Sequence, residues 1–236
     1  MEDFPQAEAL DTTFEGLSPV SLWRQFDVIR RIPRGSTNEE GVRCYLRALA
    51  DQQGWGRDED DAGNIVLRIP GRGGGERSSP LAIQGHMDMV CVKEESREHD
   101  FASDPIEVSR SMVMVEGESL EVVRAVGTSL GSDNAIGCSA GLALGLTPDL
   151  VHPPLELLFT ADEESGMTGA TNLDPRLVRA RRLLNLDAEE HGSLYVGCAG
   201  GRDLVAQWDL TRVELEPGWQ LVAFELFNLL GGHSGV

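Results

Sequence analysis

The stretch Leu81-Ala-Ile-Gln-Gly-His86-Met-Asp88-Met-Val90 combines the apolar residues of a covered α/β strand with two polar side chains. His86 and Asp88 are two residues apart, and in an extended chain this spacing places both on one face. Histidine is the commonest side-chain metal ligand, and a carboxylate that accepts its other ring proton fixes the tautomer. For this pair alone, a buried histidine satisfied by its neighbouring aspartate is the simpler interpretation.

Two further apolar runs of strand type end in acidic residues. Leu155–Thr160 leads into Glu163 and Glu164, and residues 182–186 lead into Asp187. Neighbouring carboxylates repel each other unless they face water or a cation. Ligands of α/β sheets bind outside the carboxyl ends of the strands, so we favour a cation over a solvated loop.

Asp133 follows a segment rich in turn residues, from Gly127 onward, and opens a helix of small residues that we expect to end near Leu146. The small residues would let this helix pack close to a sheet. A helix N-terminus favours a carboxylate through its unpaired amides and its dipole. A capping role for Asp133 is therefore as reasonable as a metal role.

The remaining segments predict a mixture of helices and strands. We expect helices from Pro19 to about Arg31 and, after a capping box at residues 36–40, to about Gly54. Strands are predicted at residues 64–69, in a hairpin from 106 to 115, and in alternating segments at 203–210 and 219–229. The acidic run at residues 58–61 is interpreted as a solvated loop, and His99 as a surface residue.

Composition excludes several classes of function. The 39 acidic residues outnumber the 20 basic ones, and a formal charge of -19 disfavours binding to nucleic acid or to anionic membranes. The N-terminus does not resemble a signal peptide and no apolar run reaches about 18 residues, so we expect a cytoplasmic protein. The four cysteines form no Cys-x-x-Cys pair and are expected to be reduced and mostly buried.

Together, the strand ends and the helix start supply several carboxylates and one imidazole. This set of donors, without thiolates, suits zinc, manganese or cobalt in a hydrolytic site. A bridging carboxylate would hold two ions about 3.5–4 Å apart, the arrangement of two-metal hydrolases. Of the adjacent Glu163 and Glu164, one could bind metal while the other takes a proton from water.

Seven motifs in order resemble the M20 metallopeptidases, and more narrowly the aminoacyl-histidine (Xaa-His) dipeptidases. They are Ile32-Pro-Arg-Gly-Ser36, Gln84-Gly-His-Met-Asp-Met-Val90, Gly131-Ser-Asp-Asn134, Ala161-Asp-Glu-Glu-Ser-Gly-Met167, Leu184-Asn-Leu-Asp187 with Glu189-Glu190, Val196-Gly-Cys-Ala-Gly-Gly201 and Gly231-Gly-His-Ser-Gly235.

The resemblance implies a role for each matching residue of a two-ion site. One ion would be bound by His86 and Asp187, and the other by Glu164, with Asp133 as the bridge. Of the remaining residues, Asp88 would orient His86, Glu163 would be the general base, and His233 would stabilise the oxyanion across a dimer interface.

The implied fold is α/β, a mixed sheet flanked by helices as in zinc exopeptidases, in residues 1–197. Residues 198–236 would begin an α+β lid and dimerisation domain, inside which the sequence stops before the family's last histidine ligand. Ala135 stands where the family suggests glycine. The expected function is hydrolysis of Xaa-His (carnosine-like) dipeptides with two divalent ions, preferably zinc, by a homodimer when full length. A truncated or degenerate relative that binds metal incompletely, and an M20 tripeptidase or aminoacylase, remain alternatives.

Overall fold

The computed structural model describes residues 9–115, 117–188, 190, 192–197, 205–209, 211, 214, 217–220 and 222–225. It divides into two units, Met1–Asp187 and Ala188–Val236. In the second unit, two strands were predicted, at residues 203–210 and 219–229. The residues of these segments that the structure describes do not form strands, and Val205, Trp208 and Phe224 are exposed. His233 and Glu189 lie outside the described residues.

The first unit is built on a five-stranded sheet with the order β1-β2-β6-β3-β7. These strands are β1 (Gly56–Glu59), β2 (Ile65–Ile69), β6 (Leu155–Thr160), β3 (Leu81–His86) and β7 (Leu183–Asn185). The pairs β1–β2 and β2–β6 are antiparallel, whereas β3 is parallel to both β6 and β7. The predicted mixed sheet flanked by helices is therefore confirmed.

Strand β1 was not predicted, because its acidic residues suggested a solvated loop. They lie on an exposed edge strand, where arginines neutralise them: Arg68 pairs with Asp58 at 2.8 Å and Arg47 with Glu59 at 2.6 Å. An edge strand can carry charged side chains because they stay in water.

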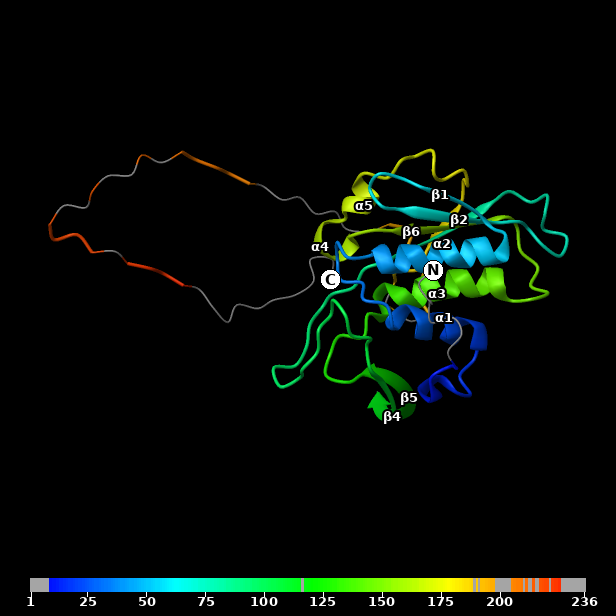
Figure 1. The fold of residues 1–236 in the computed structure, drawn as a ribbon, viewed down its shortest axis with the longest axis horizontal. Coiled ribbons are helices and arrows are strands. Elements are labelled where there is room, and N and C mark those ends of the chain that lie inside the picture. The colour runs from blue at the N-terminus through cyan, green and yellow to red at the C-terminus, as the bar shows by residue number, and fades with distance from the viewer. Residues whose placement is uncertain are drawn as a thin grey trace. The chain divides into compact units, whose positions relative to one another are not determined.

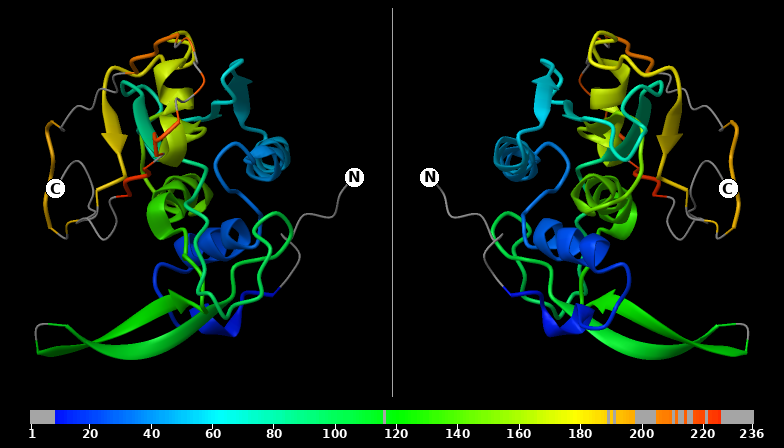
Figure 2. Two further views of the ribbon diagram at one scale, coloured as in Figure 1. Left: turned by 90° about the vertical axis from the view of Figure 1, so that its left-hand side faces the viewer. Right: turned by 90° about the vertical axis from the view of Figure 1, so that its right-hand side faces the viewer.

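Two helices, α2 (Glu40–Gln53) and α3 (Ser132–Leu146), cover one face of this sheet, and a third, α1 (Val20–Arg30), lies beside them (Figures 1 and 2). α1 packs on α3, α3 packs on β3 and β6, and α2 packs on β1 and β2. Both early helices form near the predicted positions, although their N-caps, Pro19 and Glu39, make no side-chain capping bond. Gly54 ends α2 in the left-handed conformation that favours glycine.

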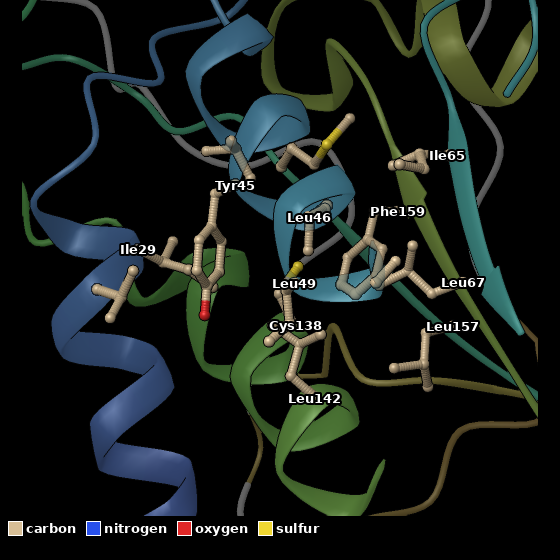
Figure 3. Close-up of a cluster of buried hydrophobic side chains, with 14 of the residues drawn as sticks. Ile29, Tyr45, Leu46, Leu49, Ile65, Leu67, Cys138, Leu142, Leu157 and Phe159 are labelled. Atoms are coloured by element: carbon tan, nitrogen blue, oxygen red, sulfur yellow. The ribbon is translucent and has the colours of Figure 1, made fainter. Parts of the chain in front are cut away.

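The core lies between these helices and the sheet. Figure 3 shows Leu46 and Leu49 of α2 directed toward Leu142 of α3 and toward Leu67 and Phe159 of the strands. Alternation along β2 places Val66 on the opposite face, where it joins a smaller cluster. Both faces of the central strands are thus covered, which explains why most of their residues are apolar. Two charged residues on these strands, Arg68 of β2 and Glu156 of β6, pair with each other at 2.5 Å.

The remaining elements of this unit are peripheral. The strands β4 (Val108–Val115) and β5 (Glu118–Ala125) form a hairpin as a separate sheet. The hairpin was predicted within residues 106–115, but that range contains only its first strand. A short 3₁₀ helix, η2 (Thr12–Phe14), precedes α1, and two single turns, α4 (Glu163–Gly166) and α5 (Thr168–Thr171), follow β6. No helix in the described part of the chain is long and apolar enough to span a membrane.

Two predictions about burial were wrong. Of the free thiols in the described residues, Cys138 is buried, Cys44 is partly buried and Cys91 is exposed. His99 is buried rather than on the surface, because its ring packs edge-on against Phe101 with 4.5 Å between centroids. Cys198 is outside the described residues.

Candidate metal centre

The carboxyl ends of β6, β3 and β7 lie at one edge of the sheet, because these strands are parallel neighbours. The middle strand, β3, ends at His86, and the flanking strands lead to Glu163 and to Asp187. The fold therefore brings together residues that are about a hundred positions apart in the chain.

The imidazole of His86 is the centre of this group. Its Nε2 lies 2.8 Å from Asp133 Oδ1, 3.6 Å from Asp187 Oδ1 and 3.9 Å from Glu163 Oε2. The side chain is 1% exposed, whereas the three carboxylates are partly open to solvent. A buried imidazole nitrogen thus faces several solvent-accessible carboxylate oxygens, and all of these atoms can bind a metal ion.

Glu164 completes a compact ligand set. His86, Asp133 and Glu164 each offer one donor atom, and these atoms lie within 4.8 Å of one another. This combination of one imidazole and hard carboxylate oxygens fits a divalent hydrolytic metal, as the donor types alone predicted.

Asp88 is fully buried and makes more contacts than the sequence predicted. Its carboxylate lies 3.2 Å from His86 Nδ1 and accepts a hydrogen bond from Ser36 Oγ at 2.7 Å. It also accepts the backbone N–H groups of Glu163 at 3.0 Å and of Glu164 at 3.1 Å. Asp88 therefore fixes the histidine ring and also the turn that carries both glutamates.

Asp133 lies at the start of α3 but does not cap it. Gly131, the N-cap residue, is left-handed with φ 66°, and Asp133 and its neighbour Asn134 have non-helical backbone angles. The Asp133 carboxylate contacts His86, and no side chain among the described residues caps α3. The capping alternative is thus not what this structure shows.

Asn134 was not singled out from the sequence. Its Nδ2 donates to Leu186 O at 2.6 Å and to Asp187 Oδ1 at 2.7 Å, so it holds Asp187 against the start of α3. The available signal was its place beside Asp133 in the Gly131–Asn134 motif. Asn134 is 2% exposed, as a group with a positioning role would be.

Burial and the neighbouring charges shift the pKa values of His86, Glu164 and Asp187. Burial opposes protonation of His86, but Asp88 and Asp133 together raise its pKa to about 9. Burial and the neighbouring Asp133 raise the pKa of Asp187 to about 6, and burial with Asp133 also raises the pKa of Glu164. The group thus retains protons that a bound cation would displace.

A second acidic group, formed by Glu39, Asp88 and Asp162, has donor atoms equally close together. Its oxygens are already used: Glu39 Oε1 accepts the backbone N–H groups of Thr37 and Asp162, and the Asp162 carboxylate accepts the hydroxyls of Ser165 and Thr168. These contacts shape the turn after β6, so this second group is structural.

Comparison with known proteins shows that this chain is similar to peptidases. No family model matches the chain. The cytosol non-specific dipeptidase of Escherichia coli K12 is 40% identical over 219 residues, which is 93% of this chain and 44% of that protein. The crystal structure of aminoacylhistidine dipeptidase from Vibrio alginolyticus matches with a TM-score of 0.71 and 38% identity, over 82% of this chain and 37% of that one.

The chain belongs to the M20 family of metallopeptidases. The resemblance seen in its ordered motifs is thereby confirmed, and its relatives are hydrolases of peptides. The chain spans less than half the length of these two relatives. A tripeptidase from Staphylococcus aureus, with a TM-score of 0.55, 21% identity and coverage of 72% of this chain and 43% of that one, shares the fold.

Proposed function

We propose that this M20 chain provides the catalytic site of a metal-dependent dipeptidase that hydrolyses Xaa-His dipeptides. The observation that carries the proposal is the convergence of His86, Asp133, Glu163, Glu164 and Asp187 at the ends of three parallel strands. The donor types fit two divalent ions, preferably zinc, with manganese or cobalt as alternatives.

In the proposed site, His86 and Asp187 hold one ion, Glu164 holds the other, and Asp133 is shared. Bound ions would polarise the peptide carbonyl and ease the deprotonation of water. The hydrogen bond between Asp88 and His86 supports this assignment, since it leaves Nε2 facing the carboxylates.

Glu163 is proposed as the general base, which takes a proton from the attacking water and delivers it to the leaving amine. Two features support this role. The backbone N–H of Glu163 is anchored to Asp88, whereas its side chain is 32% exposed and lies beside His86. The carboxylate is thus held near the site and can still reach a substrate.

The further parts of the proposal rest on the resemblance. They are a catalytic domain over residues 1–197, a lid and dimerisation domain beginning at 198–236, a homodimer, and His233 as the group that stabilises the oxyanion. A cytoplasmic location is proposed from the name of the E. coli relative. The preference for a C-terminal histidine is proposed from the name of the Vibrio relative, whereas the E. coli relative is called non-specific.

The test combines metal binding with substrate comparison. The metal-free chain is titrated with Zn²⁺, Mn²⁺ and Co²⁺ by calorimetry, and the loaded chain is then given β-alanyl-histidine, alanyl-alanine and trialanine. Two ions per chain and fastest cleavage of the histidine dipeptide are expected. Preference for alanyl-alanine or trialanine would contradict the Xaa-His assignment. One ion or none, with no cleavage, would favour a degenerate relative.

A further inference from the structure

Arg34 is a buried cation that does not pair with any of the carboxylates of the metal site. It is 1% exposed, and its Nη1 donates to Met87 O at 2.9 Å and to Asp88 O at 2.6 Å. Its Nη2 donates to Gly131 O. Its Nε has no hydrogen-bond partner among the described residues. Within the described part of the chain, its hydrogen bonds therefore all go to backbone carbonyls.

These carbonyls belong to two separate segments of the site. Met87 and Asp88 directly follow His86, and Gly131 is the residue at which the backbone turns to present Asp133. The guanidinium therefore joins the segment that carries the histidine ligand to the segment that carries the proposed bridge. A planar guanidinium holds several acceptors in a fixed geometry, which a lysine ammonium does not do.

The bonding pattern also suits a metal site electrostatically. An arginine paired with the carboxylates would occupy the oxygens that a metal needs. Arg34 uses its donors on carbonyls instead, while its charge still attracts the nearby Asp88 and Asp133. Arg34 therefore does not occupy the carboxylate oxygens of Asp133, one of which contacts His86 instead.

The two residues after Arg34 reinforce the same contact. Gly35 pairs with Met89 in a short parallel bridge, in which the Met89 N–H donates to Arg34 O at 3.1 Å. A Cβ at position 35 would lie 2.9 Å from Cys91 Sγ, so a larger residue there would require the Cys91 side chain to move. Ser36 then donates to the Asp88 carboxylate.

We propose that Arg34 is a positioning residue of the metal site, which sets the separation between His86 and Asp133 by holding Asp88 and Gly131 on one guanidinium. This inference rests on the proposed function, because it concerns the same metal ligands. It assigns a role to a residue that donates to backbone carbonyls of the site and not to the proposed ligand side chains.

The test measures Co²⁺ affinity and the visible Co²⁺ spectrum of the full chain, with urea unfolding of the metal-free protein in parallel. Arg34→Met removes the guanidinium, and Arg34→Lys keeps a positive charge without the planar set of N–H donors. Arg30→Met is the matched control, since Arg30 is also buried and also donates to a backbone carbonyl, that of Ile106, away from the site.

We expect Arg34→Met to weaken Co²⁺ binding 10–100-fold and to shift the spectrum, as disturbance of groups that orient metal ligands does. Arg34→Lys should be intermediate, and it serves as the test if Arg34→Met fails to fold. Arg30→Met should lose stability while its affinity per folded chain and its spectrum stay like those of the wild type.

Wild-type affinity and spectrum in folded Arg34→Lys and Arg34→Met would overturn the positioning role and leave the metal site in place. Equal weakening by Arg30→Met would also overturn it, because any buried arginine would then have the same effect. Absence of Co²⁺ binding by the wild-type chain would instead overturn the proposed function, and this inference with it.

Discussion

The carboxylate of Asp88 accepts a hydrogen bond from the backbone N–H of Glu163 at 3.0 Å. The residue proposed to orient the histidine ligand therefore also anchors the turn that carries the proposed general base. A change at Asp88 reaches both through direct contacts, so loss of ligand orientation and displacement of the base should occur together.

Replacement of Asp88 by asparagine should reveal this double role. An amide nitrogen cannot accept the hydrogen bonds that an Asp88 oxygen accepts, so a buried donor loses its partner, at a cost of about 1–3 kcal/mol of unfolding free energy. Metal affinity should fall 10–100-fold. Urea unfolding and calorimetric titration measure both effects.

The control for this change is Asp104→Asn. Asp104 also accepts a backbone N–H, that of Asp100, but it is exposed and remote from the site. It should change stability and metal affinity little. Equal effects of the two substitutions would contradict the special position of Asp88.

The adjacent glutamates should separate into base and ligand. Glu163→Gln should lower turnover of an Xaa-His dipeptide by about 10²–10⁴-fold, because the amide cannot take a proton, and should leave metal affinity nearly unchanged. Glu164→Gln should lower metal affinity, and its loss of turnover should follow from the loss of metal. Steady-state kinetics and metal content distinguish the two variants, and unchanged turnover in Glu163→Gln would refute its assignment as the base.

Metal affinity should rise with pH. The pKa of His86 is about 9 in the metal-free site, so below that pH an ion must displace a proton, and apparent affinity should increase about tenfold per pH unit. Below about pH 6 the dependence should steepen, because Asp187 is then protonated as well. Calorimetry in two buffers of different ionisation enthalpy counts the protons released, and zero release at pH 7 would contradict the prediction.

The metal-free chain should lose stability as pH rises. The folded-state pKa of His86, about 9, lies above its ordinary 6.5, so its stabilising contribution is complete below 6.5 and disappears as pH rises through 9. The pKa of Asp187 is also raised on folding, from 3.8 to about 6, so its contribution to stability likewise decreases as pH rises through this range. Melting temperatures in chelator should therefore fall from pH 6 to pH 9. A His86→Gln variant should not show the decline above 6.5, and persistence of that decline would assign it to other groups.

Close packing behind the site can be tested at Gly85. A Cβ there would lie 2.1 Å from Asn134 Oδ1, so Gly85→Ala should displace Asn134 and cost about 1–3 kcal/mol of stability. At Gly56 in the edge strand, a Cβ would meet Arg68 Cβ at 3.5 Å, an ordinary contact. Gly56→Ala should be tolerated, and equal denaturation midpoints for the two variants would contradict the packing argument.

The sequence predicted which candidate ligands would come together because their chemistry is local to each strand end. His86 interrupts an apolar run, and the acids at residues 163, 164 and 187 each follow another, so the sheet rule alone brings them to one edge. The helices and the buried strands were found for the same reason, since their periodicity is a local property.

The contacts missed from the sequence all depend on tertiary structure. The bonds from Asp88 to the amides of residues 163 and 164, from Arg34 to three carbonyls, and from Asn134 to Asp187 join segments at least 50 residues apart. Strand β1 was missed because its charges suggest a loop, and only its pairing with β2 reveals it. Periodicity carries no information about such partners.

The spacing between the parallel neighbours β6, β3 and β7 sets the distance between the candidate ligands at their ends. Adjacent strands are held about 4.7–4.9 Å apart by backbone hydrogen bonds, slightly more than the separation of about 3.5–4 Å between paired ions. Ligands at the ends of three successive strands therefore begin at a separation suited to two ions, whichever side chains fill the core. Core residues of this scaffold could accordingly change one by one during evolution without altering the strand spacing that separates the candidate ligands.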